Sequence, residues 1–142
     1  MKKIVIIFHL VIVFLISGCA TNLTSKIAQD TNLSELGKIF VVHFEPDKRE
    51  LNRIIADQLT LMGYPAITGE KDVIPEDVDT LVTYIDNWQW DISNYMIKIN
   101  IQFRDRKTEK IIAIGESYRT SLVRKTPKEM IQETLEEIFK KK

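Results

Sequence analysis

Hydrophobic residues recur along this chain with two periods, one typical of strands and one typical of helices. Residues 39–44 (IFVVHF) predict a strand buried on both faces, because no polar residue interrupts the run before His43. After Pro46, apolar residues recur every three or four positions, which predicts an amphipathic helix. Its expected caps are Asp47, supported by Glu50, at the start and Gly63 at the end. The predicted apolar stripe is Leu51, Ile54, Ile55, Leu59 and Met62.

The middle of the chain alternates with the period of strands. Residues 64–68 predict a short strand, and residues 80–91, 95–104 and 110–122 predict three longer strands joined as a meander. The alternation predicts one buried and one wet face in the second long strand. Its expected buried side consists of Tyr95, Ile97, Ile99, Ile101 and Phe103.

A second amphipathic helix is predicted at the C-terminus. Thr126 is its expected N-cap, Pro127 its first residue and Glu129 the partner in a capping box. Each helix has a single apolar stripe, so both are expected to cover one face of the same sheet. The predicted fold is an α+β two-layer sandwich, in the order β-α-β-β-β-β-α, with a mixed or antiparallel sheet of about four to five strands.

The first residues follow a different pattern. Lys2 and Lys3 precede an apolar run, residues 4–16, and the small residues Ser17 and Gly18 follow it. A helix of about 13 residues reaches only ~20 Å, which is too short for a hydrocarbon core of ~30 Å. A charged start, a short apolar middle and a small-residue end are typical of a secretory signal peptide.

Ile16-Ser17-Gly18-Cys19 resembles the lipobox of bacterial lipoproteins. The resemblance implies cleavage between Gly18 and Cys19 and attachment of diacylglycerol to the Cys19 sulfur, with a further acyl chain such as palmitate on the new amine. One acyl chain binds a membrane only marginally, whereas two or three anchor stably. Ala20, in place of an aspartate after the cysteine, implies the periplasmic side of the outer membrane if the cell is Gram-negative. The expected divisions are a signal peptide (1–18), a lipidated flexible tether (19–37) and one α+β domain (38–142).

Removing the signal peptide changes the composition. The mature chain has 124 residues, with 18 basic and 20 acidic side chains, a net charge of −2. This length is enough for one domain with a core. With Cys19 lipidated no thiol remains, and the near-neutral charge argues against nucleic acid as a partner. We expect no cofactor apart from the covalent lipid.

Catalytic and metal-binding patterns are not found in the sequence. His43 is the one histidine of the mature chain and is expected to be a satisfied strand-end residue. Asp86 and Asp91 lie about 16 Å apart on an extended strand, too far for a glycosidase pair. The acidic loop 70–79 lacks the spacing of a calcium loop. We therefore expect a protein that is not an enzyme and has no metal site.

Aromatic residues offer the candidate binding site. Tyr84, Trp88 and Trp90 share one face of their predicted strand, and Tyr95 and Tyr118 lie on neighbouring strands. If the helices cover the other face, these rings form an exposed patch, and exposed Tyr and Trp favour binding. Alternatively, the rings are the core between sheet and helices. Asp86, in the middle of the row, favours a face that meets water.

The predicted arrangement is similar to small envelope lipoproteins, including the lipopolysaccharide-assembly lipoprotein and the lipoprotein activators of penicillin-binding proteins. Residues 38–140 resemble a family of uncharacterised bacterial lipoprotein domains through residues 81–84, 88–91 and 101–105.

Two functions are compatible with these observations. One is a non-catalytic interaction or accessory module in cell-envelope assembly or maintenance, binding an envelope protein, a glycan or another copy of itself, for example through a free strand edge. The other is a pocket for a small amphiphile or glycan.

Overall fold

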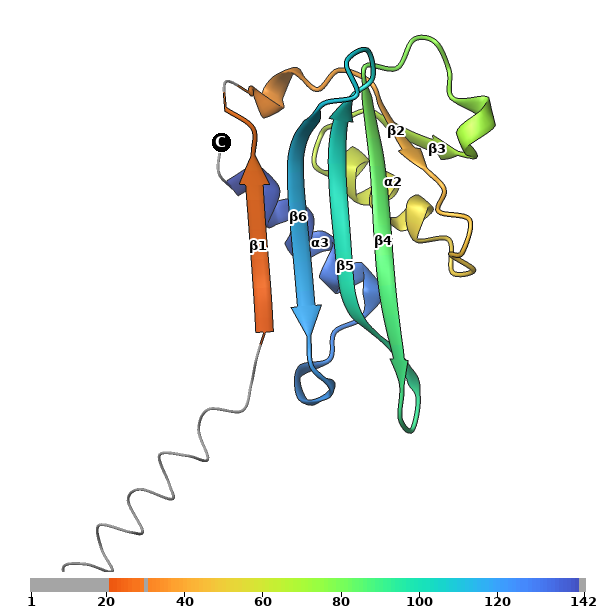
Figure 1. Cartoon of the computed structure of the whole chain (residues 1–142), viewed down its shortest axis with the longest axis vertical. Coiled ribbons are helices and arrows are strands. Elements are labelled where there is room, and N and C mark those ends of the chain that lie inside the picture. The colour runs from red at the N-terminus through yellow and green to blue at the C-terminus, as the bar shows by residue number, and fades with distance from the viewer. Residues whose placement is uncertain (1–20, 30, 141–142) are drawn as a thin grey trace, which may run out of the picture.

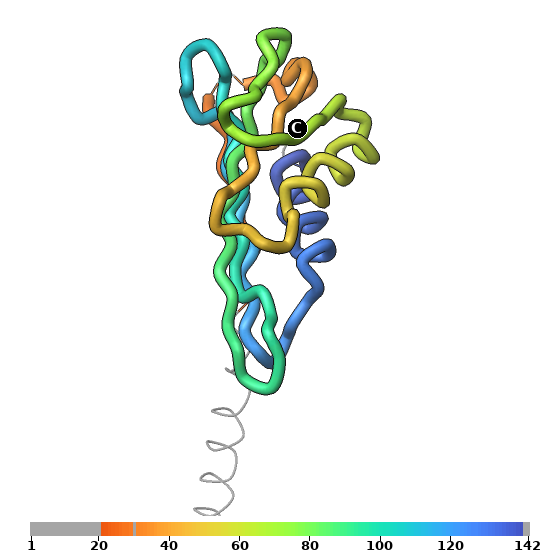
Figure 2. The backbone as a smooth tube through the Cα atoms, turned by 90° about the vertical axis from the view of Figure 1, so that its right-hand side faces the viewer, coloured from red at the N-terminus to blue at the C-terminus, as the bar shows by residue number. Residues whose placement is uncertain are grey.

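The computed structural model describes residues 21–29 and 31–140. One mixed sheet forms the first layer, and two helices, α2 (Leu51–Leu61) and α3 (Pro127–Lys140), pack on one of its faces (Figures 1 and 2). The α+β class and the two helices are therefore confirmed. The sheet has six strands, not the four to five that the sequence predicted.

The strands lie in the order β1-β6-β5-β4-β2-β3. The long strands β4 (Thr80–Trp90), β5 (Asn94–Asp105) and β6 (Ile111–Arg119) form the predicted antiparallel meander. The short strands β2 (Ile39–Val42) and β3 (Ala66–Gly69) continue the sheet in parallel beyond β4. The core lies between the sheet and the helices, where Leu51, Ile55, Ile101, Phe103 and Leu135 are fully buried.

The sixth strand is β1 (Thr21–Ile27), which lies inside the segment predicted to be a flexible tether (19–37). It pairs antiparallel with β6 along its whole length, from Thr21 opposite Arg119 to Ile27 opposite Ala113. Its inward side includes Ser25, which is buried and donates a hydrogen bond to the Glu137 carbonyl of α3 at 3.0 Å. The tether prediction is therefore wrong for residues 21–27. Ser25 lies between Leu23 and Ile27 on the inward side, so a polar residue interrupts the apolar alternation that would have predicted a strand.

The caps of α2 differ from the prediction at one end. The helix begins at Leu51, four residues after Asp47, and Glu50 has a left-handed backbone with φ of 55°. The buried Asp47 carboxylate still accepts hydrogen bonds from the amides of Arg49 and Leu51, both at 2.7 Å. At the other end Gly63, with φ of 90°, completes the predicted glycine cap.

The capping box of α3 is present as predicted. Glu129 accepts a hydrogen bond from the Thr126 amide at 2.8 Å, and Thr126 Oγ1 accepts one from the Glu129 amide at 3.3 Å. The two bonds satisfy donors that the first helical turn leaves without partners. They fix the direction in which α3 crosses β6 and β1, where Met130, Ile131 and Ile138 are fully buried.

Gly115 of β6 lets α3 approach the sheet closely. A Cβ atom at this position would lie 2.7 Å from Cδ1 of Ile138 and 2.8 Å from Cγ2 of Thr134. We expect Gly115→Ala to lower the free energy of unfolding by about 1–3 kcal/mol, because overpacking forces α3 outward. Urea denaturation of the purified protein measures this change.

The matched control is the same substitution in an Ile138→Ala background, which removes the clashing atoms of Ile138 and leaves the contact with Cγ2 of Thr134. In this background Gly115→Ala is expected to lower the free energy of unfolding by less than it does in the wild type, because the effects of two residues in contact are not additive. An equal decrease in the free energy of unfolding in both backgrounds would show that Ile138 does not pack closely on Gly115.

Candidate functional site

The five aromatic residues of the predicted patch do not lie on one surface. Tyr84 is 3% exposed and belongs to the core beneath the helices, so the patch prediction is wrong for it and the core alternative is right. Its hydroxyl donates a hydrogen bond to Oδ2 of Asp47 at 2.7 Å and accepts one from the Phe44 amide. Burial, together with the neighbouring Asp47 carboxylate, raises the pKa of Tyr84.

The two tryptophans follow Tyr84 on the same side of β4 but differ in exposure. Trp88 is half-buried and packs against the edge of the core, with the Arg49 guanidinium 3.8 Å from its ring centroid. Its indole nitrogen donates a hydrogen bond to Asp86. Trp90 lies beyond the helices and is 73% exposed. Only the end of the predicted row therefore meets solvent freely.

Tyr95 and Tyr118 lie on the face of β4, β5 and β6 that points away from the helices, here called the open face. A β-bulge places Lys98 opposite Asn87 but Met96 opposite Trp88, so Ile97 is left without a partner. The bulge reverses the alternation, and Met96, not Tyr95, is buried. Tyr95 instead donates a hydrogen bond to Gln89 at 3.0 Å. Its expected place on the buried side of β5 is thus also wrong.

A row of hydrogen-bonded polar side chains, here called the polar ladder, crosses the open face. Its members are Lys98, Glu116, Asn100, Gln102 and Arg104. The Lys98 ammonium lies 2.8 Å from Glu116, and Arg104 donates to Gln102, also at 2.8 Å. Ile85 stands beside the ladder and is 52% exposed. The open face therefore combines amide groups, charges and an exposed apolar side chain.

A hollow of about 320 Å³ adjoins the polar ladder. Its lining comes from β4, β5 and the end of β2: Phe44, Thr83, Tyr84, Ile85, Asn100, Gln102 and Arg104. Ile85, Asn100, Gln102 and Arg104 line it from the open face, whereas the Tyr84 side chain is buried in the core. Such a lining can hold a small molecule that has one apolar side and several hydroxyl groups.

Two adjacent turns carry exposed apolar side chains at one end of the sheet. The turn between β4 and β5 contributes Trp90 and Ile92, which are 73% and 96% exposed, and the turn after β6 contributes Leu122, 77% exposed. We call these three residues the apolar end. Neither Ile92 nor Leu122 was predicted to lie in this surface: Ile92 is an isolated apolar residue in a turn, and Leu122 was the last residue of the strand predicted over residues 110–122, whereas β6 ends at Arg119.

Arg124 joins these two turns. Its guanidinium donates hydrogen bonds to Asp91 and to Oγ of Ser93, and it stacks on the Tyr95 ring with 3.9 Å between Cζ and the ring centroid. The Ile92 and Ser93 amides, together with Arg124, hold the pKa of Asp91 below its usual range. A charged clamp thus holds the two turns side by side.

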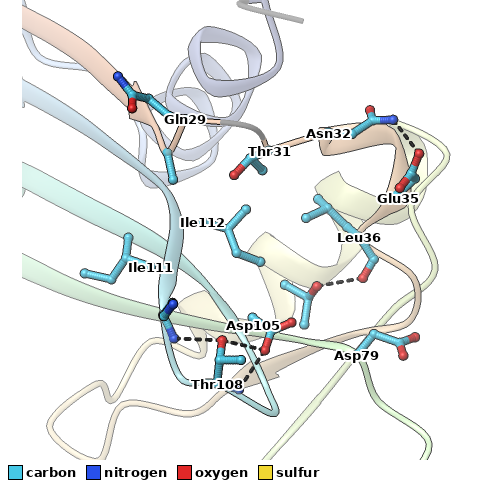
Figure 3. Close-up of a pocket in the computed structure, with 13 residues that line it drawn as sticks. Gln29, Thr31, Asn32, Glu35, Leu36, Asp79, Asp105, Thr108, Ile111 and Ile112 are labelled. Carbon is cyan, nitrogen blue, oxygen red and sulfur yellow. Dashed lines mark hydrogen bonds between the residues drawn. The ribbon is translucent and has the colours of Figure 1, made fainter.

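A larger hollow of about 410 Å³ lies at the opposite end of the sheet (Figure 3). Several of its polar groups bond within local structure: Oδ1 of Asp105 accepts hydrogen bonds from the amide and hydroxyl of Thr108, both at 2.7 Å. Thr80 donates to the Leu36 carbonyl at 2.6 Å. These bonds stabilise turns and offer little to a ligand.

His43 has two partners, as the sequence analysis expected of it. Nδ1 lies 2.7 Å from Glu70, and Nε2 lies 3.1 Å from the Asp47 carbonyl. Burial alone would lower the pKa of His43, but the Asp47 carbonyl and the Glu70 carboxylate together raise it. Within residues 21–29 and 31–140, no group of three or more His, Cys, Asp or Glu is placed to hold a metal ion.

Glu133 of α3 holds the most buried ion-pair network of the described chain. It accepts hydrogen bonds from Nε of Arg119 at 3.0 Å, from Ser117 at 2.5 Å and from Lys125. Burial alone would raise the pKa of Glu133, but Arg119, Lys125 and Ser117 hold it below its usual range. The network connects α3 to the end of β6 and to the turn that carries Leu122.

The chain matches no protein-family model and no curated protein. Among the helices of the described residues, none is both long and apolar enough to cross a membrane. Its fold is similar to two structures of PelC from Paraburkholderia phytofirmans, both dodecamers. One, a variant, is 14% identical with a TM-score of 0.59, over 82% of this chain and 95% of that chain.

The second PelC structure is 11% identical with a TM-score of 0.62, over 84% of this chain and 98% of that chain. A PDZ domain protein from Parabacteroides distasonis is 10% identical with a TM-score of 0.50, over 80% of this chain and 34% of that chain. Similarity at these identities shows the fold alone.

The Glu133 network makes stability depend on pH. Because the pKa of Glu133 is lower in the folded protein, its contribution is present above the unfolded value near 4.5 and is lost as the pH falls through the folded value. We expect Glu133→Gln to lower the free energy of unfolding by about 1–3 kcal/mol at pH 7. The difference from the wild type should shrink below pH ~4, as measured by urea denaturation across the pH range.

Glu136→Gln is the matched control, since Glu136 is an exposed glutamate on the same helix. It is expected to change stability little at any pH. If Glu133→Gln lowers the free energy of unfolding by the same amount at low pH as at pH 7, the stabilisation does not come from the charge of Glu133.

Proposed function

We propose that this protein is a bacterial envelope lipoprotein, anchored through Cys19, that acts as a non-catalytic interaction module in cell-envelope assembly or maintenance. After export, the lipid on Cys19 holds the domain at the membrane, and Ala20 after the cysteine favours the periplasmic side of the outer membrane. The open face then remains available to a partner.

One observation carries the interaction role. The helices cover a single face of the sheet, and the opposite face of β4, β5 and β6 has no helix over it (Figures 1 and 2). Solvent-facing sides of antiparallel sheets are usually polar. Here Ile85 is 52% exposed, and Tyr95 and Tyr118 lie on the same face as the polar ladder. An apolar centre beside polar groups is the composition of a protein interface.

Self-association is the form of interaction that the comparisons support. The two PelC structures of similar fold are dodecamers. A fold that exposes one whole sheet face and two strand edges offers extended surfaces for repeated contacts between copies. We therefore propose a second copy of this chain as the first partner to test.

A glycan is the second candidate partner, because of the hollow of about 320 Å³ beside the polar ladder. Amide and guanidinium groups bind hydroxyls, and Ile85 and Phe44 supply apolar contact for a sugar face.

If a glycan binds in this hollow, Arg104→Ala is expected to weaken binding of a peptidoglycan oligosaccharide by about tenfold, because one charged hydrogen bond is lost. Isothermal titration calorimetry measures the affinity, and Lys107→Ala, an exposed cation outside the hollow, is the control.

Lipid attachment is tested on the full chain expressed in a bacterium. We expect mass spectrometry to find an acylated N-terminal Cys19 and the protein to float with membrane vesicles, since two or three acyl chains anchor stably. Cys19→Ser should abolish acylation and cleavage before residue 19. An unmodified Cys19 in the wild-type protein would contradict the anchoring proposal.

Interaction through the open face is tested by photocrosslinking in intact cells. A photoreactive residue at Ile85, 52% exposed on the open face, is expected to give a discrete adduct. The control is the same residue at Lys128, exposed on α3. An adduct at a multiple of the chain's mass identifies self-association, and another mass identifies a different partner. No adduct from position 85, or equal adducts from both positions, would contradict a binding role for this face.

A further inference from the structure

The apolar end lies at the same end of the sheet as the first described residue of the chain. Thr21 pairs with Arg119, the last residue of β6, and the turn that carries Leu122 follows directly. The turn between β4 and β5 lies beside it, joined through Arg124 (Figures 1 and 2). Trp90, Ile92 and Leu122 therefore lie at the end of the sheet from which the chain leads back to Cys19.

The distance from the domain to the lipid is short. Two residues of extended chain span at most about 7 Å, so the Cα atom of Cys19 cannot lie farther than this from the Cα atom of Thr21. Because β1 begins at Thr21, Ala20 is the one residue between Cys19 and the sheet. A lipid on Cys19 inserted in a bilayer thus brings this end of the sheet to the membrane surface.

The charges near the apolar end are paired within the protein. Arg124 bonds Asp91, and Lys125 bonds Glu133. Three large apolar side chains stand beside these ion pairs and are 73%, 96% and 77% exposed. Exposed apolar groups on adjacent turns are costly in water and favourable at the boundary of a bilayer, where tryptophan is enriched.

We propose that the apolar end docks into the phospholipid surface as a second membrane contact beside the acyl chains of Cys19. This inference rests on the proposed lipid anchor. Trp90, Ile92 and Leu122 enter the boundary between headgroups and acyl chains, to a depth of the order of 5–10 Å. The two contacts together hold the sheet upright on the membrane, with the open face exposed along its side.

The test uses the mature lipidated protein reconstituted into phosphatidylcholine vesicles whose acyl chains are brominated, since bromine quenches nearby tryptophan fluorescence. Both natural tryptophans are replaced, Trp88→Phe and Trp90→Phe, and one new tryptophan is introduced by Leu122→Trp. The matched control is Leu61→Trp in the same background, because Leu61 is equally exposed, at 77%, but ends α2 in the helix layer (Figure 2).

The Leu122→Trp protein is expected to lose at least about three times as much fluorescence as the Leu61→Trp protein, because only the apolar end reaches the acyl chains. Equal quenching at both positions, in protein that floats with the vesicles, overturns docking while the anchor stands. It would leave the apolar end as a protein-binding surface. Protein that is not acylated and does not float overturns the anchor and this inference together.

Discussion

The pairing of β1 with β6 is the constraint on which the rest of this structure depends. It brings the beginning of the domain into the sheet, next to the last residues of β6 and below α3. Residues 21–27 thereby form an edge strand of the sheet. The positions of the domain's surfaces relative to Thr21 are then set by the geometry of the sheet, and not by the average extension of a flexible linker.

Several polar groups at the faces and ends of the sheet bond to specific partners within the domain. Asp47 satisfies the start of α2 and the Tyr84 hydroxyl, which keeps an aromatic ring with a polar tip inside the core. Glu133 and Arg124 connect the turns at one end to α3 and to each other. The open face keeps its own connected row of side chains, the polar ladder. Such satisfied networks specify one arrangement of the strands.

The sequence predicts the helices and the meander well because their signals are local. Apolar spacing, the Thr126–Glu129 box and Gly63 each act within a few residues. The strand β1 is not predictable in the same way, since its stability comes from β6, far along the chain, and its inward Ser25 hides the alternation. The side of the sheet on which Tyr95 lies depends on the β-bulge at Ile97, and no residue in this segment is of a type that predicts a bulge. Ile92 and Leu122 become a surface only when Arg124 brings their turns together.

The early position of β1 in the chain also has a consequence for the order of events during maturation. In the proposed lipoprotein, Cys19 and Thr21 leave the secretion channel long before Arg119, the partner of Thr21 in the sheet. Until β6 follows, β1 therefore has no partner strand in the sheet. Once β6 has arrived, the backbone from Thr21 to Ile27 is held at the edge of the sheet. Completion of the sheet at this edge thus has to wait for a strand that lies about one hundred residues further along the chain.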